Sequence, residues 1–230
     1  MINLTILALI IGNTFSNAAP VLLTGLGGMM SEKSGVVNIG LEGMMTIGAL
    51  TGAVLGYYVG NPWLAFLGGG LAGAFFGLIH AFVSVSLAGD QTISGIAINT
   101  LAPGLALFLS RLFFSGATQT PSIPLENKIP RLFRGISSSQ VFDNIFGQYA
   151  TVYLSLIMVV VLYVVLYKTK IGLRVIAVGE HPKASESLNI NVVKVRYLSV
   201  IFSGFMADFG EGDSGFDNPP WGKGILVSMA

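Results

Sequence analysis

Polar side chains interrupt the apolar sequence at two places where they could take part in binding. They lie in residues 31–42, SEKSGVVNIGLE, and in residues 89–99, GDQTISGIAIN. Burying the Glu42 carboxylate in a membrane span costs about 2–4 kcal/mol, so such a group normally faces a cavity, a partner or the membrane interface. Asn38 and Glu42 are four residues apart, which on a helix places both on one face, where they could point toward a pathway through the protein. Alternatively, Glu42 lies at the interface in the first turn of the next helix, where an acid complements the helix dipole.

A third polar stretch, residues 168–196, is amphipathic and too charged to span a membrane. An excess of Lys and Arg marks a cytoplasmic loop. Pro182 suits the first position of a helix and Asn189 can adopt the left-handed conformation that ends one, which predicts a short exposed helix between them. Two interpretations stay open: the stretch docks a cytoplasmic partner, or it is a cationic loop against anionic lipid head groups. Its charged residues are Lys168, Lys170, Arg174, Lys183, Lys194 and Arg196 against Glu180 and Glu186.

Several chemistries lack the residues that they would need. A phosphate-binding loop ends in Lys followed by Ser or Thr, and the nearest match, residues 222–224, lacks the hydroxyl residue and the upstream glycine. His80 and His181 have no Cys or carboxylate cluster nearby, so we expect no metal site. The serines of the apolar segments have no companion His or Asp for catalysis. A net charge of +1 without a basic stripe argues against nucleic acid. We therefore expect neither an enzyme nor a cofactor site.

The polar residues must be positioned by membrane-spanning helices. The chain is 53% hydrophobic and 10% charged, whereas soluble domains carry roughly a quarter charged residues. Apolar runs of about 20 residues are long enough to cross a bilayer, and long unbroken runs favour helices over a closed barrel. We expect an all-α, polytopic transmembrane bundle, in which Pro20 makes the first segment either a kinked span or two pieces. The apolar segments are residues 3–30, 38–58, 63–88, 93–114 and 149–167, with a sixth that opens at 197.

Small residues recur at a four-residue spacing in two of these segments. In lipid, such stripes let two helices approach closely and gain van der Waals contact. The pattern therefore predicts packing faces within the bundle and no chemistry. One stripe is Gly48, Gly52, Gly56 and Gly60, and the other is Ala65, Gly69, Gly73, Gly77 and Ala81.

The three polar stretches resemble a known family, the permease subunits of ABC importers for ribose-like sugars, nucleosides and branched-chain amino acids. GVVNIGLEGMMTIGA, residues 35–49, resembles the family's discontinuous second helix. GLRVIAVGEHPKASESLNINVVKVR, residues 172–196, resembles its cytoplasmic coupling loop. QTISGIAIN together with SGVVNIGLEG is most similar to the nucleoside branch, which works with basic membrane lipoproteins. The resemblance runs from Asn3 to about Gly204.

The resemblance implies a larger machine in the bacterial cytoplasmic membrane, crossed several times by this chain. Its partners would be an ATPase subunit that binds the ATP, a second and different permease subunit, an extracytoplasmic substrate-binding lipoprotein and membrane lipid. The substrate would be a nucleoside or a simple sugar. His181, Ser185 and Asn189 stand where the family pattern has Asn, Ala and Gly. Near the substrate pathway the resemblance places Asn38, Glu42 and Asn99, and at the ATPase coupling surface it places Gly179, Glu180, His181, Pro182, Ala184 and Leu188.

The sequence changes character after Gly204. We expect a permease domain over residues 1–207, incomplete at its end, and a polar, disordered or aberrant tail over 208–230, because acids and Pro219-Pro220 replace the further spans of the family. A truncated or frame-shifted subunit that does not transport is therefore one alternative function. A secondary transporter is another, although it needs paired ionisable groups in the membrane and only Glu42 qualifies.

Overall fold

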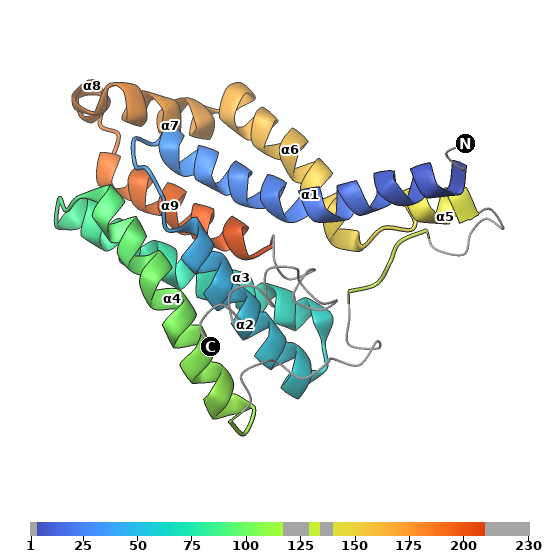
Figure 1. Ribbon diagram of the computed structural model, residues 1–230. Helices are drawn as coiled ribbons and strands as arrows, with labels where there is room; N and C mark the ends of the chain where they lie inside the picture. The colour runs from blue at the N-terminus through green and yellow to red at the C-terminus, as the bar shows by residue number, and fades with distance from the viewer. Residues whose placement is uncertain (1–3, 117–128, 134–139, 210–230) are drawn as a thin grey trace.

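The computed structural model describes residues 4–116, 129–133 and 140–209, apart from the side chains of the last two. This part of the chain is a helix bundle (Figure 1). Its one pairing of extended residues is an isolated bridge between Arg131 and Tyr149. The predicted all-α fold is confirmed. In chain order the helices are α1 (Leu4–Lys33), α2 (Leu41–Val59), α3 (Pro62–Ala81), the π-helix η1 (Phe82–Ser86), α4 (Gln91–Phe113), α5 (Gln140–Phe146), α6 (Ala150–Lys168), α7 (Lys170–Glu180), α8 (Pro182–Ser187) and α9 (Val192–Phe209).

The first apolar segment forms one helix of 30 residues, so the alternative of two pieces is wrong. Pro20 lies inside α1 and removes a single backbone donor, which the rest of the helical bonding tolerates. The hydroxyl of Thr24 donates to the Pro20 carbonyl at 2.9 Å and reinforces this turn. A helix of this length extends about 45 Å, so it must tilt or project to fit a hydrocarbon core about 30 Å thick.

Short polar caps separate the successive apolar helices. Gly60 ends α2 in the left-handed conformation (φ 70°), which glycine adopts without strain. The Asn61 side chain then accepts hydrogen bonds from the first backbone N–H groups of α3, and Pro62 occupies the first helical position. Asp90 caps α4 in the same way by accepting from Thr92 and Ile93 at 2.8 and 3.0 Å. These caps fix where α3 and α4 begin.

Four of the described helical stretches are long and apolar enough to cross a membrane. They are Leu4–Lys33, Pro62–Ser86, Gln91–Phe113 and Ala150–Lys168. The remaining predicted segments also form helices, α2 and α9. Helix α2 carries one charged residue, Glu42, and α9 carries Lys194, Arg196 and Asp208. The chain is a polytopic membrane protein.

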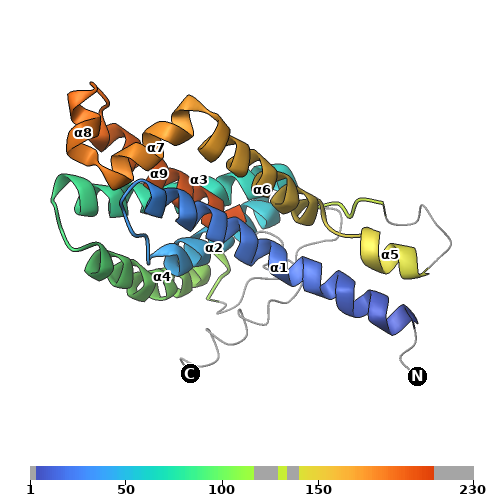
Figure 2. The ribbon, with the colours of Figure 1, turned by 90° about the horizontal axis from the view of Figure 1, so that it is seen from above.

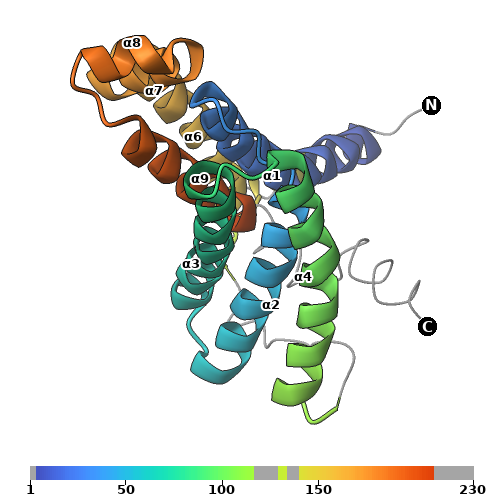
Figure 3. The ribbon, with the colours of Figure 1, turned by 90° about the vertical axis from the view of Figure 1, so that its left-hand side faces the viewer.

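The glycine stripes pack the helices as predicted. A Cβ added to Gly52 would lie 3.5 Å from the Ala65 carbonyl oxygen, so α2 and α3 are in close backbone contact. The other stripe, on α3, also contacts α9: a Cβ on Gly77 would lie 2.9 Å from the Val200 carbonyl oxygen. Figure 3 shows α2, α3 and α4 side by side, and Figure 2 shows α9 running beside α1 and α3.

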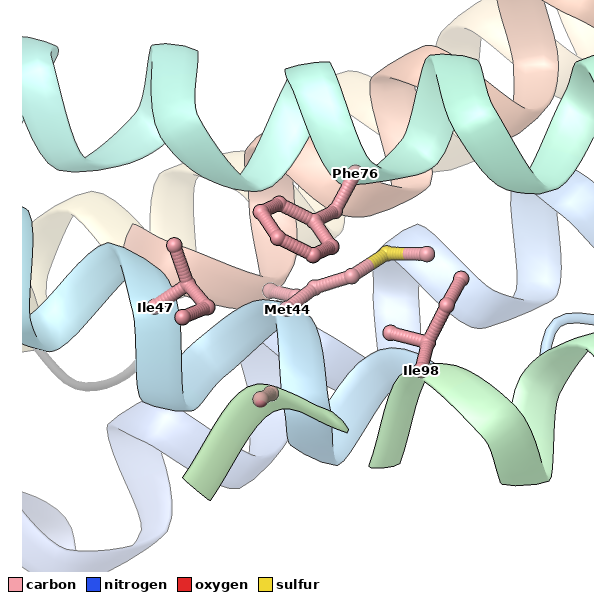
Figure 4. Close-up of a cluster of buried hydrophobic side chains, with 6 residues drawn as sticks. Met44, Ile47, Phe76 and Ile98 are labelled. Carbon is pink, nitrogen blue, oxygen red and sulfur yellow. The ribbon is translucent and has the colours of Figure 1, made fainter. Parts of the chain in front are cut away.

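Apolar side chains fill the space where α2, α3 and α4 meet (Figure 4). Met44 and Ile47 of α2 pack with Phe76 of α3 and Ile98 of α4, and Ala102 and Ala207 complete the buried cluster. The cluster joins α9 to this group of helices. It lies next to the start of α2, so it supports the polar segment described below.

The predicted tail, residues 208–230, falls almost wholly outside the described residues. Only the last two positions of α9 belong to it. The division of the chain at residue 207 therefore stays a prediction.

Candidate functional site

Residues 34–40 form a non-helical segment between α1 and α2, here called the unwound segment. The resemblance predicted a discontinuous helix at this place. Inside a membrane bundle, backbone groups that leave a helix need other partners. Side chains from α3, α4 and α9 supply them. The partners of these backbone groups are His80, Gln91, Asn99 and Arg196, and Ser203 binds the Asn38 side chain.

Asn38 is buried in the unwound segment, with 6% of its surface exposed. Its Nδ2 donates to the Ser203 hydroxyl of α9 at 2.7 Å, and its Oδ1 accepts from the Gly40 N–H at 3.1 Å. The expectation that Asn38 and Glu42 share a helical face is wrong, because the chain becomes helical only at Leu41. Asn38 points into the bundle, whereas Glu42 is exposed in the first turn of α2. The alternative location of Glu42, in the first helical turn, is confirmed.

Asn99 of α4 caps the start of α2. Its Oδ1 accepts from the Gly43 N–H at 2.7 Å, and its Nδ2 donates to the Ile39 carbonyl at 3.0 Å. The residue before α2 is Gly40, which has no side chain to cap the helix itself. The approach is close, since a Cβ on Gly43 would lie 2.7 Å from the Ile98 carbonyl oxygen. Asn99 therefore fixes where the unwound segment ends.

His80 is fully buried and bridges the unwound segment to α4. Its Nε2 lies 3.2 Å from the Val37 carbonyl oxygen, and its Nδ1 lies 2.9 Å from the Ser94 hydroxyl. A carbonyl oxygen only accepts, so Nε2 carries the proton, and in the neutral ring Nδ1 accepts from Ser94. Gln91 completes this contact by accepting from the Val37 N–H at 2.7 Å.

Of these partners of the unwound segment, only Asn99 was predicted as a site residue from the sequence. In the sequence His80 was considered as a metal ligand and Arg196 only as one of the charges of residues 168–196, and nothing distinguished Gln91 or Ser203. A lone histidine in an apolar helix was the available signal, because ionisable residues in spans usually serve a function. Over the described part of the chain, no group of three or more His, Asp or Glu side chains could hold a metal ion.

The predicted short helix of the coupling loop is confirmed as α8. Pro182 takes its first position, and Asn189 follows its end with a positive φ of 61°. Ser185 is buried and its N–H and hydroxyl both reach the His181 carbonyl. The outer surface of α8 is formed by exposed Ala184 and by Leu188, whose side chain is 76% exposed.

The other predicted coupling residues divide into two groups. Glu180 and His181 are exposed beside α8, and Pro182 is partly exposed. Gly179 instead faces the end of α1, where an added Cβ would lie 2.3 Å from the Lys33 carbonyl oxygen and 3.2 Å from the Gly35 nitrogen. This backbone contact, the Gly179 junction, joins α7 to the start of the unwound segment.

Arg196 reinforces the same place from α9. Its Nε donates to the Ser34 carbonyl at 3.3 Å. The unwound segment is thus held at one end by α7 and α9, next to the predicted coupling surface, and at the other end by Asn38 and Asn99. Of the two sets of predicted site residues, the unwound segment contains Asn38 and contacts Asn99 of the first set and Gly179 of the second.

Comparison with known proteins agrees with this arrangement. The family model described as branched-chain amino acid transport system / permease component matches residues 10–210. A guanosine ABC transporter permease protein of Bacillus subtilis is 44% identical over 218 residues, which cover 90% of this chain and 67% of that protein. A nucleoside ABC transporter permease protein of Lactococcus lactis is 34% identical over 89% of this chain and 66% of its own length.

A more distant relative is named for a sugar. A glucose ABC transporter permease protein of Haloferax volcanii is 27% identical over 84% of this chain and 53% of its own length. The chain spans about two thirds of the length of the first two relatives. No solved structure matches it. The matched family, the helices and their apolar length agree: the chain belongs to the permease component family of branched-chain amino acid transport systems and is a multi-pass protein of the cytoplasmic membrane.

Proposed function

We propose that this chain is a permease subunit of an ABC importer that carries a nucleoside, or a simple sugar, across the cytoplasmic membrane. The observation that carries the proposal is the similarity to the guanosine and nucleoside permeases over about nine tenths of the chain. The relative named for glucose supports the sugar alternative. Such subunits are transport components, and the energy for transport comes from ATP hydrolysis on a separate subunit.

The proposed partners are an ATPase subunit, a second and different permease subunit and an extracytoplasmic substrate-binding lipoprotein. The ATPase would dock on α8 and the residues beside it, Glu180, His181, Pro182, Ala184 and Leu188. Exposed apolar side chains such as Leu188 are costly in water and commonly form the centre of a protein interface. Gly179 would not contact the ATPase itself but would connect this surface to the end of α1, which it contacts.

The substrate pathway would pass the unwound segment. Amide side chains both donate and accept hydrogen bonds, as recognition of sugar hydroxyls or base edges requires. In this structure the Asn38 amide binds the Ser203 hydroxyl and the Gly40 N–H, and the Asn99 amide binds the Gly43 N–H and the Ile39 carbonyl. The exposed Glu42 carboxylate is available at the first turn of α2. A rearrangement of the segment between inward-open and outward-open states would alter the affinity for substrate, and this difference couples transport to ATP hydrolysis.

Uptake by a reconstituted complex tests the proposed function. The chain would be expressed with its ATPase, second permease and lipoprotein partners, and uptake of labelled guanosine, ribose and glucose would be compared in vesicles. We expect ATP-dependent guanosine uptake that disappears when the ATPase partner carries an inactive phosphate-binding loop. Uptake that survives this change but stops when the proton gradient is collapsed would instead indicate a secondary transporter.

A further inference from the structure

The chain changes direction between α6 and α7 (Figure 1). Thr169 between them is extended (φ −118°, ψ 157°), and its hydroxyl oxygen accepts from the Gly172 N–H at 3.3 Å. A Cβ on Gly172 would lie 2.2 Å from the carbonyl oxygens of Val165 and Leu166, so only glycine allows the two helices to approach this closely. Because α6 is apolar and α7 leaves its axis, α7 belongs at the membrane surface rather than inside the bilayer.

One face of α7 is cationic and partly apolar. Lys170, Leu173 and Arg174 are three and four residues apart, and all are exposed. Leu173 has 61% of its surface exposed, and Ile171, which flanks this face in the first turn of α7, has 64% exposed. The opposite face, with Gly172, Val175 and Val178, is buried against the bundle.

The last turn of α6 extends this face. Lys168 is exposed there, and within the described residues no carboxylate pairs with Lys168, Lys170 or Arg174. Tyr163 and Tyr167 stand one turn apart on the same helix with ring centroids 5.4 Å from each other, and both are about half exposed. Tyrosines in this position mark the level of the lipid head groups. The charged end of α6 and the outer face of α7 therefore lie at head-group depth.

We propose that Lys168, Lys170 and Arg174, with Ile171 and Leu173, form a binding site for anionic phospholipids of the inner leaflet. The cations contact the lipid phosphates, and the two apolar side chains enter the boundary with the acyl chains, as in other interfacial amphipathic helices. Charge separates this site from α8, where Lys183 stands among Glu180 and Glu186. The cationic loop thus divides into a lipid-binding helix, α7, and a protein-docking helix, α8.

The chain contains no cysteine, which allows a direct test. A Leu173→Cys variant of the full chain, labelled with an environment-sensitive fluorophore, would be reconstituted in vesicles that carry a spin-label quencher on either phosphatidylglycerol or phosphatidylcholine. We expect strong quenching by both lipids and stronger quenching by the labelled phosphatidylglycerol. The matched control is Leu188→Cys on α8, whose label should stay in water and escape quenching.

Charge removal tests the selectivity. In the Leu173→Cys background, K168Q, K170Q and R174Q together should lower the preference for phosphatidylglycerol roughly tenfold or more, since each surface cation contributes separately. The same three substitutions are also made in the Leu188→Cys variant, where accessibility of the thiol to a water-soluble reagent verifies that the charge variant keeps its orientation. Equal quenching by the two lipids would overturn the proposal. So would a label at position 173 that is as exposed to water as the label at position 188. The test needs no ATPase and no substrate, so its outcome is independent of the proposed function.

Discussion

Asn99 caps the start of α2, a role that the residue immediately before a helix usually fills. The first N–H groups of a helix lack intrahelical partners, and Gly40 offers none from its side chain. Asn99 reaches across from α4 to accept from the Gly43 N–H and to donate to the Ile39 carbonyl. One amide therefore ends the unwound segment and joins two helices.

Removal of this amide should destabilise the protein. Asn99→Ala leaves the Gly43 N–H and the Ile39 carbonyl without their partner, which we expect to lower the free energy of unfolding by about 1–3 kcal/mol. The measurement is thermal unfolding of the purified chain in detergent. Thr100→Ala is the matched control, because the Thr100 hydroxyl donates only to Ile96 within its own helix. A melting temperature that falls equally in both variants would contradict the capping role.

The sequence identified Asn38 and Asn99 as special but could not tell their partners. An amide residue within an apolar segment can be recognised in the sequence as one that needs a partner, because burying it without a hydrogen bond is costly. The Asn38 partner Ser203 is 165 residues away and lies on a helix whose packing depends on the whole bundle. The role of His80 could not be predicted for the same reason, since its partners Val37 and Ser94 lie on two other elements, the unwound segment and α4.

The elements themselves were largely predictable. Proline at the start and asparagine at the end of α8 gave its limits from local conformational preferences alone. The Gly179 junction was not predictable at this scale. The family resemblance placed Gly179 at the docking surface, and only the structure shows that it contacts the end of α1.

Gly179→Ala should uncouple α7 from the start of the unwound segment. Its Cβ would lie 2.3 Å from the Lys33 carbonyl oxygen, so α7 must move away from α1. Because the exposed residues of α8 are unchanged, we expect the ATPase still to co-purify, while substrate-stimulated ATP hydrolysis and uptake fall roughly tenfold or more. Gly25→Ala and Gly104→Ala are controls, since a Cβ at either position meets nothing within 4 Å. Full uptake by the Gly179 variant would show that the junction carries no coupling.

Helix α8 allows the converse experiment. Ala184→Asp and Leu188→Asp place charges on the exposed surface of α8, where an interface excludes water, so we expect loss of ATPase co-purification without loss of membrane insertion. Leu188→Met keeps the apolar contact and should preserve the complex. Association that persists in both aspartate variants would exclude α8 as the docking helix.

The arrangement of the whole molecule follows from where its charges gather. The sequence predicted a cytoplasmic location for residues 168–196, but it left the orientation of the first helix open. In the structure the end of α1 reaches the same end of the bundle through the Gly179 junction and the Arg196 contact, which adds Lys33 to that cationic end. Figure 3 shows α7 and α8 beside the end of α1.

The beginning of α1 and the end of α2 should accordingly lie on the extracytoplasmic side. Helix α2 starts at the unwound segment and is 19 residues long, so Val59 lies about 28 Å from that end. With no native cysteine, a thiol reagent that cannot cross the membrane should label Val59→Cys in intact cells. Ser187→Cys, at the end of α8, should react only after the membrane is inverted or opened. Labelling of both positions from the same side would contradict this orientation. It would also contradict the placement of the ATPase on α8, because the positive-inside rule puts residues 168–196 on the cytoplasmic side, opposite to the end of α2.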